Sequence, residues 1–557
     1  MDSTPSGISR RRLLGNAAGL AAGSAVLGGA SPARADAAQT PDLWREFAAT
    51  PYTHPQIPYV ARAGCDYGAT PFPSPPVRAN VQRYGAVPDG SADAAPAINA
   101  AIREVGEAGG GTVVIPAGRY RCDDIIQIGW SNVVVRGDGI GETTLYFTRS
   151  LEQIVGINRS RFGGSNSAWS WCGGLVWIAP RARFTSLVEA IQAQDWPLEG
   201  WSGNRREQCE TLTALAAPAR QGDWTVTVAD PGALAPGDRV MLQLDDTPDH
   251  ALLAHMCGDI AGTSSYYWEN KTKLLSYPPY EWPVRVTAVD GDRVTLDRPL
   301  PLDARPEFAP RLTTLVPPVT GSGLESLTVE MTETPQLRHL QDKGYNGVVL
   351  QCAWDCWVDQ VRTVHVDNGF LFVAAKACTL RRTSVGGRGS HHPYACREQS
   401  HDNLVEDFRI EDRTAPAVPG SGLHGINVEG LSSHNVWSRG VMEMATFDTH
   451  RGLPFANVRT DITVNNTGAH GGSDDAGPLY GARFAHWNVT VTNERAGCVR
   501  IDDVAPRSAT VAITPVRPFG QIDRPDFTGD LDTRLELYGT TRVTPRNLYD
   551  AQRTLGV

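Results

Sequence analysis

Lysine is scarce in this chain of 557 residues, and the only four lysines are Lys271, Lys273, Lys343 and Lys376. The formal net charge is −10 and no basic tail or stripe occurs, so the chain lacks the electrostatic footprint of a nucleic-acid-binding protein. Cysteine is also sparse, with ten residues and no Cys-x-x-Cys pair, which argues against a disulfide scaffold and a zinc ribbon. We expect Cys352 and Cys356 to be buried thiols.

Long, strongly apolar runs are missing as well. The stretch from Asn16 to Ala30 is rich in Gly and Ala and shorter than the roughly twenty apolar residues that a membrane span needs. It follows Arg10-Arg11-Arg12 and precedes Ala33-Arg34-Ala35, an arrangement that resembles a bacterial twin-arginine secretion signal. We therefore expect residues 1–35 to be a signal peptide, and the mature protein to be exported by the twin-arginine machinery to the cell exterior without a membrane anchor.

The 56 glycines and 39 prolines indicate turn-rich β structure, because 14 Trp and 15 Tyr argue against disorder. Residues 94–107 have apolar positions at helical spacing after Asp93, which predicts one capped helix. Short β-rich runs bounded by turn residues follow at 112–115, 125–128 and 133–135. The predicted fold class is therefore all-β.

The same segment carries a recognisable motif: Tyr84-Gly85-Ala86, Asp89-Gly90, Asp93 and Ile115-Pro116-Ala117-Gly118-Arg119-Tyr120. It resembles the opening of the pectate-lyase-like (pectin lyase fold) single-stranded right-handed β-helix superfamily over about residues 78 to 145. The resemblance implies a right-handed parallel β-helix with an N-terminal capping helix. It does not imply one reaction, since lyases, glycoside hydrolases, epimerases and phage tailspikes share this fold.

Repeats support a solenoid over the rest of the chain. Asn346-Gly347 and the β-prone residues after it recur as Asn368-Gly369, twenty-two positions on. Comparable β-prone segments contain Ile410, Val436, Ile462 and Val489, at separations of 26, 26 and 27. We expect a Pro-rich arm at 36–77 over the N-terminal end, β-helix coils at 78–204, an inserted small β-barrel-like domain at 205–311, further coils with the active-site face at 312–529 and a C-terminal cap at 530–557.

Seven of the thirteen histidines lie between residues 391 and 470: His391, His392, His401, His424, His434, His450 and His470. A coil of 26 residues would place Glu398 beside His424 and His424 beside His450. Asp448 would share a face with His450, because residues two apart on a strand project to the same side. This converging set of histidines and carboxylates is the strongest functional signal, although any one histidine taken alone fits a structural ladder.

The acid and base roles are assigned to His424, Asp448 and His450, and Arg397, Glu398, His401 and Arg451 are further catalytic candidates. Substrate-binding candidates are aromatic or acidic residues: Tyr267, Trp268, Tyr394, Asp474, Asp475 and Tyr480. Residues 381–460 hold nine Arg and nine Asp plus Glu, so charge alone does not establish a uronate substrate.

Two reaction classes fit these residues. In a polysaccharide lyase, a histidine or arginine removes the proton next to a uronate carboxylate while a cation such as Arg397 or Arg451 neutralises that carboxylate. In a glycoside hydrolase, two carboxylates flank the bond, and Asp448 with Glu398 or Asp474 is the natural pair. The lyase is favoured, the hydrolase is the alternative, and an epimerase or a non-catalytic glycan-binding solenoid comes after both.

A metal is left open. His424, His450 and Asp448 have the residue types of a transition-metal site, and the acidic residues could bind Ca²⁺, but no tight ligand motif supports either ion. Ca²⁺ is the cofactor that the sequence favours among these, and the expected partner is a polysaccharide or oligosaccharide substrate.

Overall fold

The computed structural model describes residues 37–157, 166–192, 201–202, 209–271, 273–449, 452–467, 477–493, 505–514, 527–540 and 542–556. The predicted signal peptide, residues 1–35, lies outside these described residues. Gln39–Val557 form one compact unit, to which all that follows refers. Among the described residues, no helix is both long enough and apolar enough to cross a membrane.

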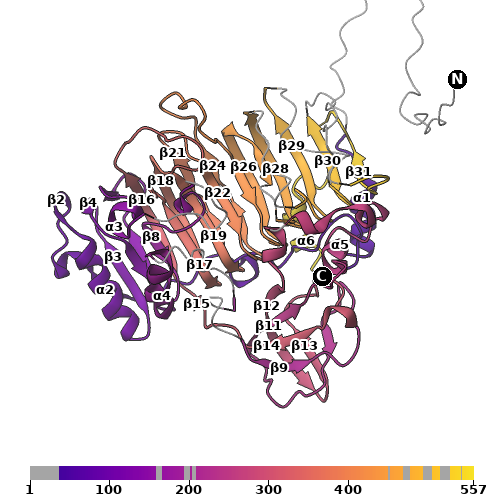
Figure 1. The fold of residues 1–557 in the computed structure, drawn as a ribbon. Coiled ribbons are helices and arrows are strands. Elements are labelled where there is room, and N and C mark those ends of the chain that lie inside the picture. The colour runs from indigo at the N-terminus through magenta and orange to yellow at the C-terminus, as the bar shows by residue number, and fades with distance from the viewer. Residues whose placement is uncertain are drawn as a thin grey trace, which may run out of the picture. The chain divides into compact units, whose positions relative to one another are not determined.

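The core of this unit is a right-handed parallel β-helix in which strands from successive coils stack on one another (Figure 1). One parallel sheet of the described residues has seventeen strands: β1 (Val77–Asn80), β2 (Asp89–Asp93), β3 (Gly111–Ile115), β4 (Gly118–Cys122), β6 (Val133–Gly137), β7 (Thr143–Phe147), β16 (Gly323–Met331), β18 (Trp357–Val364), β20 (Thr379–Arg381), β21 (Ser384–Gly386), β23 (Leu404–Glu406), β24 (Arg409–Ile410), β26 (Val436–Ala445), β28 (Val458–Asn466), β29 (Ala485–Val491), β30 (Ala509–Thr514) and β31 (Arg534–Glu536). The other has eight: β5 (Ile126–Ile128), β8 (Val176–Ile178), β15 (Val319–Thr320), β17 (Val348–Trp354), β19 (Asn368–Lys376), β22 (His392–Arg397), β25 (Ile426–Val428) and β27 (Phe447–Thr449). The predicted fold class is confirmed.

The predicted helix is α2 (Ala95–Glu107), at the end of the β-helix that carries β2 and β4 (Figure 1). Asp93 accepts a hydrogen bond from the backbone N–H of Ala95 (3.0 Å), so its carboxylate satisfies a donor of the first turn as the sequence predicts. Ile98 and Ile102 are fully buried against the first coils. The helix thus covers apolar edge residues that have no preceding coil to pack against. Cys352 and Cys356 are buried thiols, as expected.

The inserted domain is an antiparallel sheet of six strands: β9 (Thr211–Ala214), β10 (Thr225–Thr227), β11 (Arg239–Leu244), β12 (Tyr280–Asp290), β13 (Arg293–Leu296) and β14 (Arg311–Thr313). It forms the separate magenta lobe in Figure 1. Trp282 is 1% exposed, and its ring covers the buried ammonium of Lys376, which pairs with Asp402 at 2.5 Å. A buried charge is tolerated only when it is paired, so this ion pair helps to define where the domain docks.

The remaining helices are α1 (Asp42–Ala49), α3 (Leu151–Ile154), α4 (Arg181–Gln192), α5 (Ala251–Met256) and α6 (Leu548–Thr554). The sequence places the arm over the N-terminal end, and this placement is wrong for its first part. Leu43 and Phe47 of α1 pack in one apolar cluster with Leu548 and Tyr549 of α6, beside the last coils. The arm then runs to β1 at the other end, because an amphipathic helix buries its apolar face wherever a matching apolar surface exists.

Coil length is less regular than the sequence suggests. Val348 pairs with Phe370, which confirms the predicted repeat of 22 residues, and Ile462 pairs with Val489. Ile410, however, pairs with Met442, and Val436 pairs with Leu404 and Val458, so the predicted alignment of Ile410, Val436 and Ile462 is wrong. One coil is lengthened by the loop 411–425 and the next is short, and the two lengths average to the apparent period of 26.

An asparagine ladder marks this change of length. Asn435 donates from Nδ2 to the Asn457 Oδ1 atom 22 positions on (3.0 Å), and its own Oδ1 accepts from Asn403 Nδ2, 32 positions back (2.9 Å). All three side chains are at most 1% exposed. Such side chains satisfy backbone and side-chain groups that no water reaches.

We expect Asn435→Ala to lower the free energy of unfolding by about 1–3 kcal/mol, because it leaves ladder partners buried without their hydrogen bonds. Denaturant unfolding of the purified protein measures this loss. The matched control is Asn270→Ala at an exposed position, which should change stability by less than about 0.5 kcal/mol. Equal stability of the two variants would contradict a stabilising role for the ladder.

Candidate active site

Three adjacent strands of the eight-stranded sheet bring histidines and a carboxylate together. His391 and His392 lie at the start of β22, His424 lies just before β25, and Asp448 lies within β27. The backbone N–H of His424 donates to the carbonyl of His391 (3.0 Å), and Asp448 pairs with Asn427 of β25. Parallel stacking therefore makes neighbours of residues that are far apart in sequence.

The centre of this histidine cluster, defined as His339, His391, His392, His424 and Asp448, is the Asp448 carboxylate. Its Oδ2 atom lies 3.2 Å from His424 Nδ1 and 3.5 Å from His392 Nε2. The rings of His392 and His424 are stacked, with centroids 4.6 Å apart and planes 6° apart. One carboxylate thus faces two imidazoles, an arrangement that stabilises an imidazolium when either ring takes up a proton.

A second carboxylate orients His391. Asp342 Oδ2 lies 2.9 Å from His391 Nδ1 and also accepts a hydrogen bond of 2.5 Å from the Ser170 hydroxyl. Burial raises the pKa of Asp342, although the Ser170 hydroxyl and the charge of Arg388 oppose this shift. His339 is exposed, and its ring lies 4.8 Å from that of His391, so the cluster reaches the surface on this side.

Arg397 lies beside the cluster, as the sequence predicts for a cation. Its guanidinium donates to His392 Nδ1 (3.1 Å) and forms an ion pair with Glu429 (3.1 Å). Donation to Nδ1 assigns the proton of neutral His392 to Nε2, which faces Asp448. Burial lowers the pKa of His392 well below its usual value, and the nearby charges of His391 and Arg397 add to this effect, so His392 is neutral at pH 7.

Arg459 supplies a further positive charge behind Asp448. Its Nη2 donates to the backbone carbonyl of Asp448 (2.8 Å), and its Nη1 lies 3.2 Å from His486 Nε2. Burial lowers the pKa of His486, and the charge of Arg459 lowers it further. The site therefore combines neutral imidazoles with carboxylates and fixed guanidinium groups.

Two predicted catalytic residues lie elsewhere. Glu398 was expected beside His424, but its neighbour in the next coil is Gly430, because the coil between them is longer than 26 residues. His401 is fully buried under the inserted domain, where its ring nitrogens lie 2.9 Å from Ser433 Oγ and 2.9 Å from the Glu281 carbonyl. Its pKa is lowered well below the usual value by burial and by the charge of Lys376. His401 thus holds the inserted domain in place.

The aromatic substrate-binding candidates also separate. Trp268 packs in the core of the inserted domain, while Tyr394 stacks on Phe370 inside the β-helix and Tyr480 is 2% exposed, so the expectation of accessible rings at these three positions is wrong. Apolar rings that sequence reasoning assigns to sugars are here used for packing. Tyr267 is 64% exposed, and its role in binding stays a prediction.

The predicted site residues His450, Arg451, Asp474 and Asp475 lie outside the described residues. The sequence did not single out His339 or Asp342, because they lie in the segment before β17 and join the cluster only through folding. His391 and His392 were noted among the seven histidines without a role. Their adjacency to the loop that precedes a strand was the available signal.

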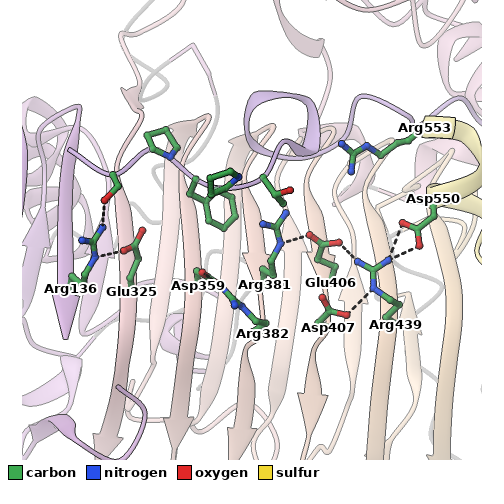
Figure 2. A pocket seen from close by; sticks show the side chains of 15 residues that line it. Arg136, Glu325, Asp359, Arg381, Arg382, Glu406, Asp407, Arg439, Asp550 and Arg553 are labelled. Carbon is green, nitrogen blue, oxygen red and sulfur yellow. Dashed lines mark hydrogen bonds and ion pairs between the residues drawn. The ribbon is translucent and has the colours of Figure 1, made fainter. Parts of the chain in front are cut away.

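A larger cavity of about 630 Å³ lies between residues 70–74 of the arm and the outer face of the seventeen-stranded sheet (Figure 2). Four of its arginines already contact carboxylates of the protein. Arg136 pairs with Glu325 (2.6 Å), Arg381 with Glu406 (2.5 Å), Arg382 with Asp359, and Arg439 with Glu406, Asp407 and Asp550. These pairs tie neighbouring coils together, so we assign the candidate active site to the histidine cluster.

Fold and cluster define a parallel β-helix with a histidine–carboxylate site on its eight-stranded sheet. Residues 78–193 match the family model described as "Rhamnogalacturonase A/epimerase, pectate lyase-like", which supports the pectin-lyase-like fold.

Curated relatives match shorter stretches. Mannuronan C5-epimerase AlgE1 of Azotobacter vinelandii is 40% identical over 177 residues, which cover 27% of this chain and 12% of that protein. Alginate lyase 7 of the same organism is 42% identical over 91 residues, 15% of this chain and 11% of the lyase. The chain thus spans about a tenth of the length of these relatives. Among solved structures, the tailspike protein gp49 from Pseudomonas phage LKA1 covers 79% of this chain and 72% of its own, with 13% identity and a TM-score of 0.44.

The buried histidines should make stability depend on pH. Burial lowers the pKa of His434 to about 3, whereas an unfolded histidine titrates near 6.5. Below about pH 6.5 the unfolded chain binds a proton that the folded chain does not, so acidification favours unfolding. We expect His434→Gln to reduce the loss of unfolding free energy between pH 6.5 and 4.5 by up to about 1.4 kcal/mol per pH unit, as measured in urea titrations. Parallel curves for variant and wild type would contradict the buried neutral state.

Proposed function

We propose that this protein is a carbohydrate-active enzyme that removes the C5 proton of a uronate residue in a polysaccharide and cleaves the chain by β-elimination. The observation that carries the proposal is the Asp448 carboxylate, which contacts His424 and His392 next to the Arg397 guanidinium. A general base, a group that stabilises its protonated form and a nearby cation are the parts that this step requires.

His424 is the proposed base. His392 receives a hydrogen bond from Arg397 on one nitrogen and faces Asp448 with the other, which makes it a positioning residue. His424 holds Asp448 with Nδ1, and it is 8% exposed and borders a surface hollow that Arg413 and Leu423 also line. Its Nε2 is therefore the nitrogen that would take the substrate proton.

The charge of the substrate carboxylate must be neutralised during this step, because removal of the adjacent proton sends electron density into it. Arg397 places a guanidinium at the cluster, and Arg451 stays the second proposal for this role. In the elimination, the base takes the proton from C5, the C–H electrons form the C4=C5 double bond, and the C4–O bond breaks. The departing oxygen takes up a proton and becomes the new hydroxyl end.

Epimerisation is the second candidate, and the relatives favour it. Both named relatives act through their printed activities on related chemistry: a mannuronan C5-epimerase and an alginate lyase. An epimerase begins with the same C5 proton removal but returns a proton to the opposite face and leaves the C4–O bond intact. The shared first step makes an alginate-like uronate polymer the proposed substrate class.

The hydrolase alternative receives less support. It requires two carboxylates across one bond, and Glu398, the predicted partner of Asp448, neighbours Gly430 instead. We further propose that the enzyme acts outside the cell after twin-arginine export, a proposal supported by the signal-like residues 1–35.

The decisive assay incubates the purified protein with mannuronan, other uronate polymers and neutral glycans in D₂O. Elimination should raise the absorbance of unsaturated uronates together with new reducing ends. Deuterium at C5 without chain cleavage would establish the epimerase. Reducing ends without the unsaturated chromophore would mean hydrolysis and contradict the proposal.

His424→Ala should lower kcat by about 10²–10⁴-fold, the usual contribution of a positioned base. Its stability should stay within about 2 kcal/mol of wild type, since the ring lies at the edge of the cluster. The matched control is His250→Ala in the inserted domain, where His250 pairs with Asp246 at 2.6 Å. Full turnover by the His424→Ala protein would contradict the assignment of the base.

A further inference from the structure

Three imidazole rings of the histidine cluster converge near the surface. His339, His391 and His424 each offer a ring nitrogen within 4.8 Å of the other two. Their ring centroids are 4.8, 5.2 and 5.7 Å apart. The three residues come from separate loops, so folding alone brings them together.

Carboxylates orient two of these rings through the same atom. His391 Nδ1 lies 2.9 Å from Asp342, and His424 Nδ1 lies 3.2 Å from Asp448. The Nδ1 edge of His339 packs against Gly422, where a Cβ atom would come within 2.1 Å of it. Metal-binding histidines commonly hold a carboxylate with one nitrogen and the ion with the other. Each ring would therefore offer Nε2.

We propose that His339, His391 and His424 bind a divalent transition-metal ion, with Zn²⁺ as the reference ion. Three neutral imidazoles suit zinc, copper, nickel and iron, whereas Ca²⁺ and Mg²⁺ require oxygen ligands. Nitrogens on one tetrahedral Zn²⁺ are about 3.3 Å apart, given Zn–N distances near 2.1 Å. Rotation of the exposed His339 side chain closes the set, and an open fourth position remains for water.

The loop that carries His339 is held in place for this purpose. The His339 backbone N–H donates to the carbonyl of Gly420 (2.8 Å), which joins the segment before β17 to the loop before β25. His339 is exposed, whereas His391 is 2% exposed, so an ion would enter from the His339 side. Asp342 and Ser170 then lie behind His391 and fix its orientation.

The binding part of this inference does not depend on the proposed function, but one consequence does. His424 Nε2 is both the proposed base and a proposed ligand, so an ion and the substrate proton would compete for the same nitrogen. Bound Zn²⁺ should therefore lower turnover, and chelator should restore it.

The test measures Zn²⁺ and Co²⁺ binding to the metal-free full chain without substrate, by equilibrium dialysis with metal analysis and by the visible absorption of Co²⁺. We expect one ion per chain, and at least a tenfold loss of affinity in His339→Ala, whose exposed position tolerates truncation. Asp342→Asn should weaken binding by about 10–100-fold through loss of ring orientation. The control His250→Ala, which removes a histidine of another His–Asp pair, should bind as wild type does.

Absence of bound ion in the wild type, or equal binding by His339→Ala and the wild type, would overturn the metal site. The proposed function fails separately, in the uronate assay on chelator-treated protein. Zn²⁺ binding without loss of turnover would support the metal site and contradict His424 as the base.

Discussion

Backbone pairing between successive coils is the constraint on which the rest of this structure depends. Each coil must return its strands to the hydrogen-bonding positions of the coil before it, whatever length its loops have. The asparagines Asn403, Asn435 and Asn457 meet this condition at one corner, although the intervening segments differ by ten residues. Loop length is therefore free to vary on the side of the eight-stranded sheet, and that is where the histidine cluster lies.

Burial of charge is the second constraint, and it links the site to the inserted domain. Arg397 is 1% exposed and needs Glu429, just as Lys376 is fully buried and needs Asp402. Burial also lowers the pKa of Lys376 to about 8, while the carboxylate of Asp402 opposes that shift. Because an unpaired buried charge is costly, such pairs make the arrangement of neighbouring coils hard to change. A rigid frame of this kind suits a site whose groups must be oriented in advance.

Much of the fold could be predicted from residues that act locally. Asp93 and the apolar spacing after it predicted α2, and Asn346-Gly347 with Asn368-Gly369 predicted a true coil repeat. The register beyond Ile410 could not be predicted, because the loop 411–425 adds residues that carry no periodic signal. Glu398 was misplaced for this reason, whereas His424 and Asp448 still meet because both lie at strands of the same face.

The sequence by itself determined the elements, the right-handed β-helix and the concentration of histidines between residues 391 and 470, since these follow from local pattern and composition. Only the tertiary structure decided which side chains touch. His339 and Asp342 join the cluster from a distant loop, and Trp268 and Tyr394 turn inward to pack. The physical reason is that contacts across coils depend on summed loop lengths and on burial, and neither quantity is encoded at any single position.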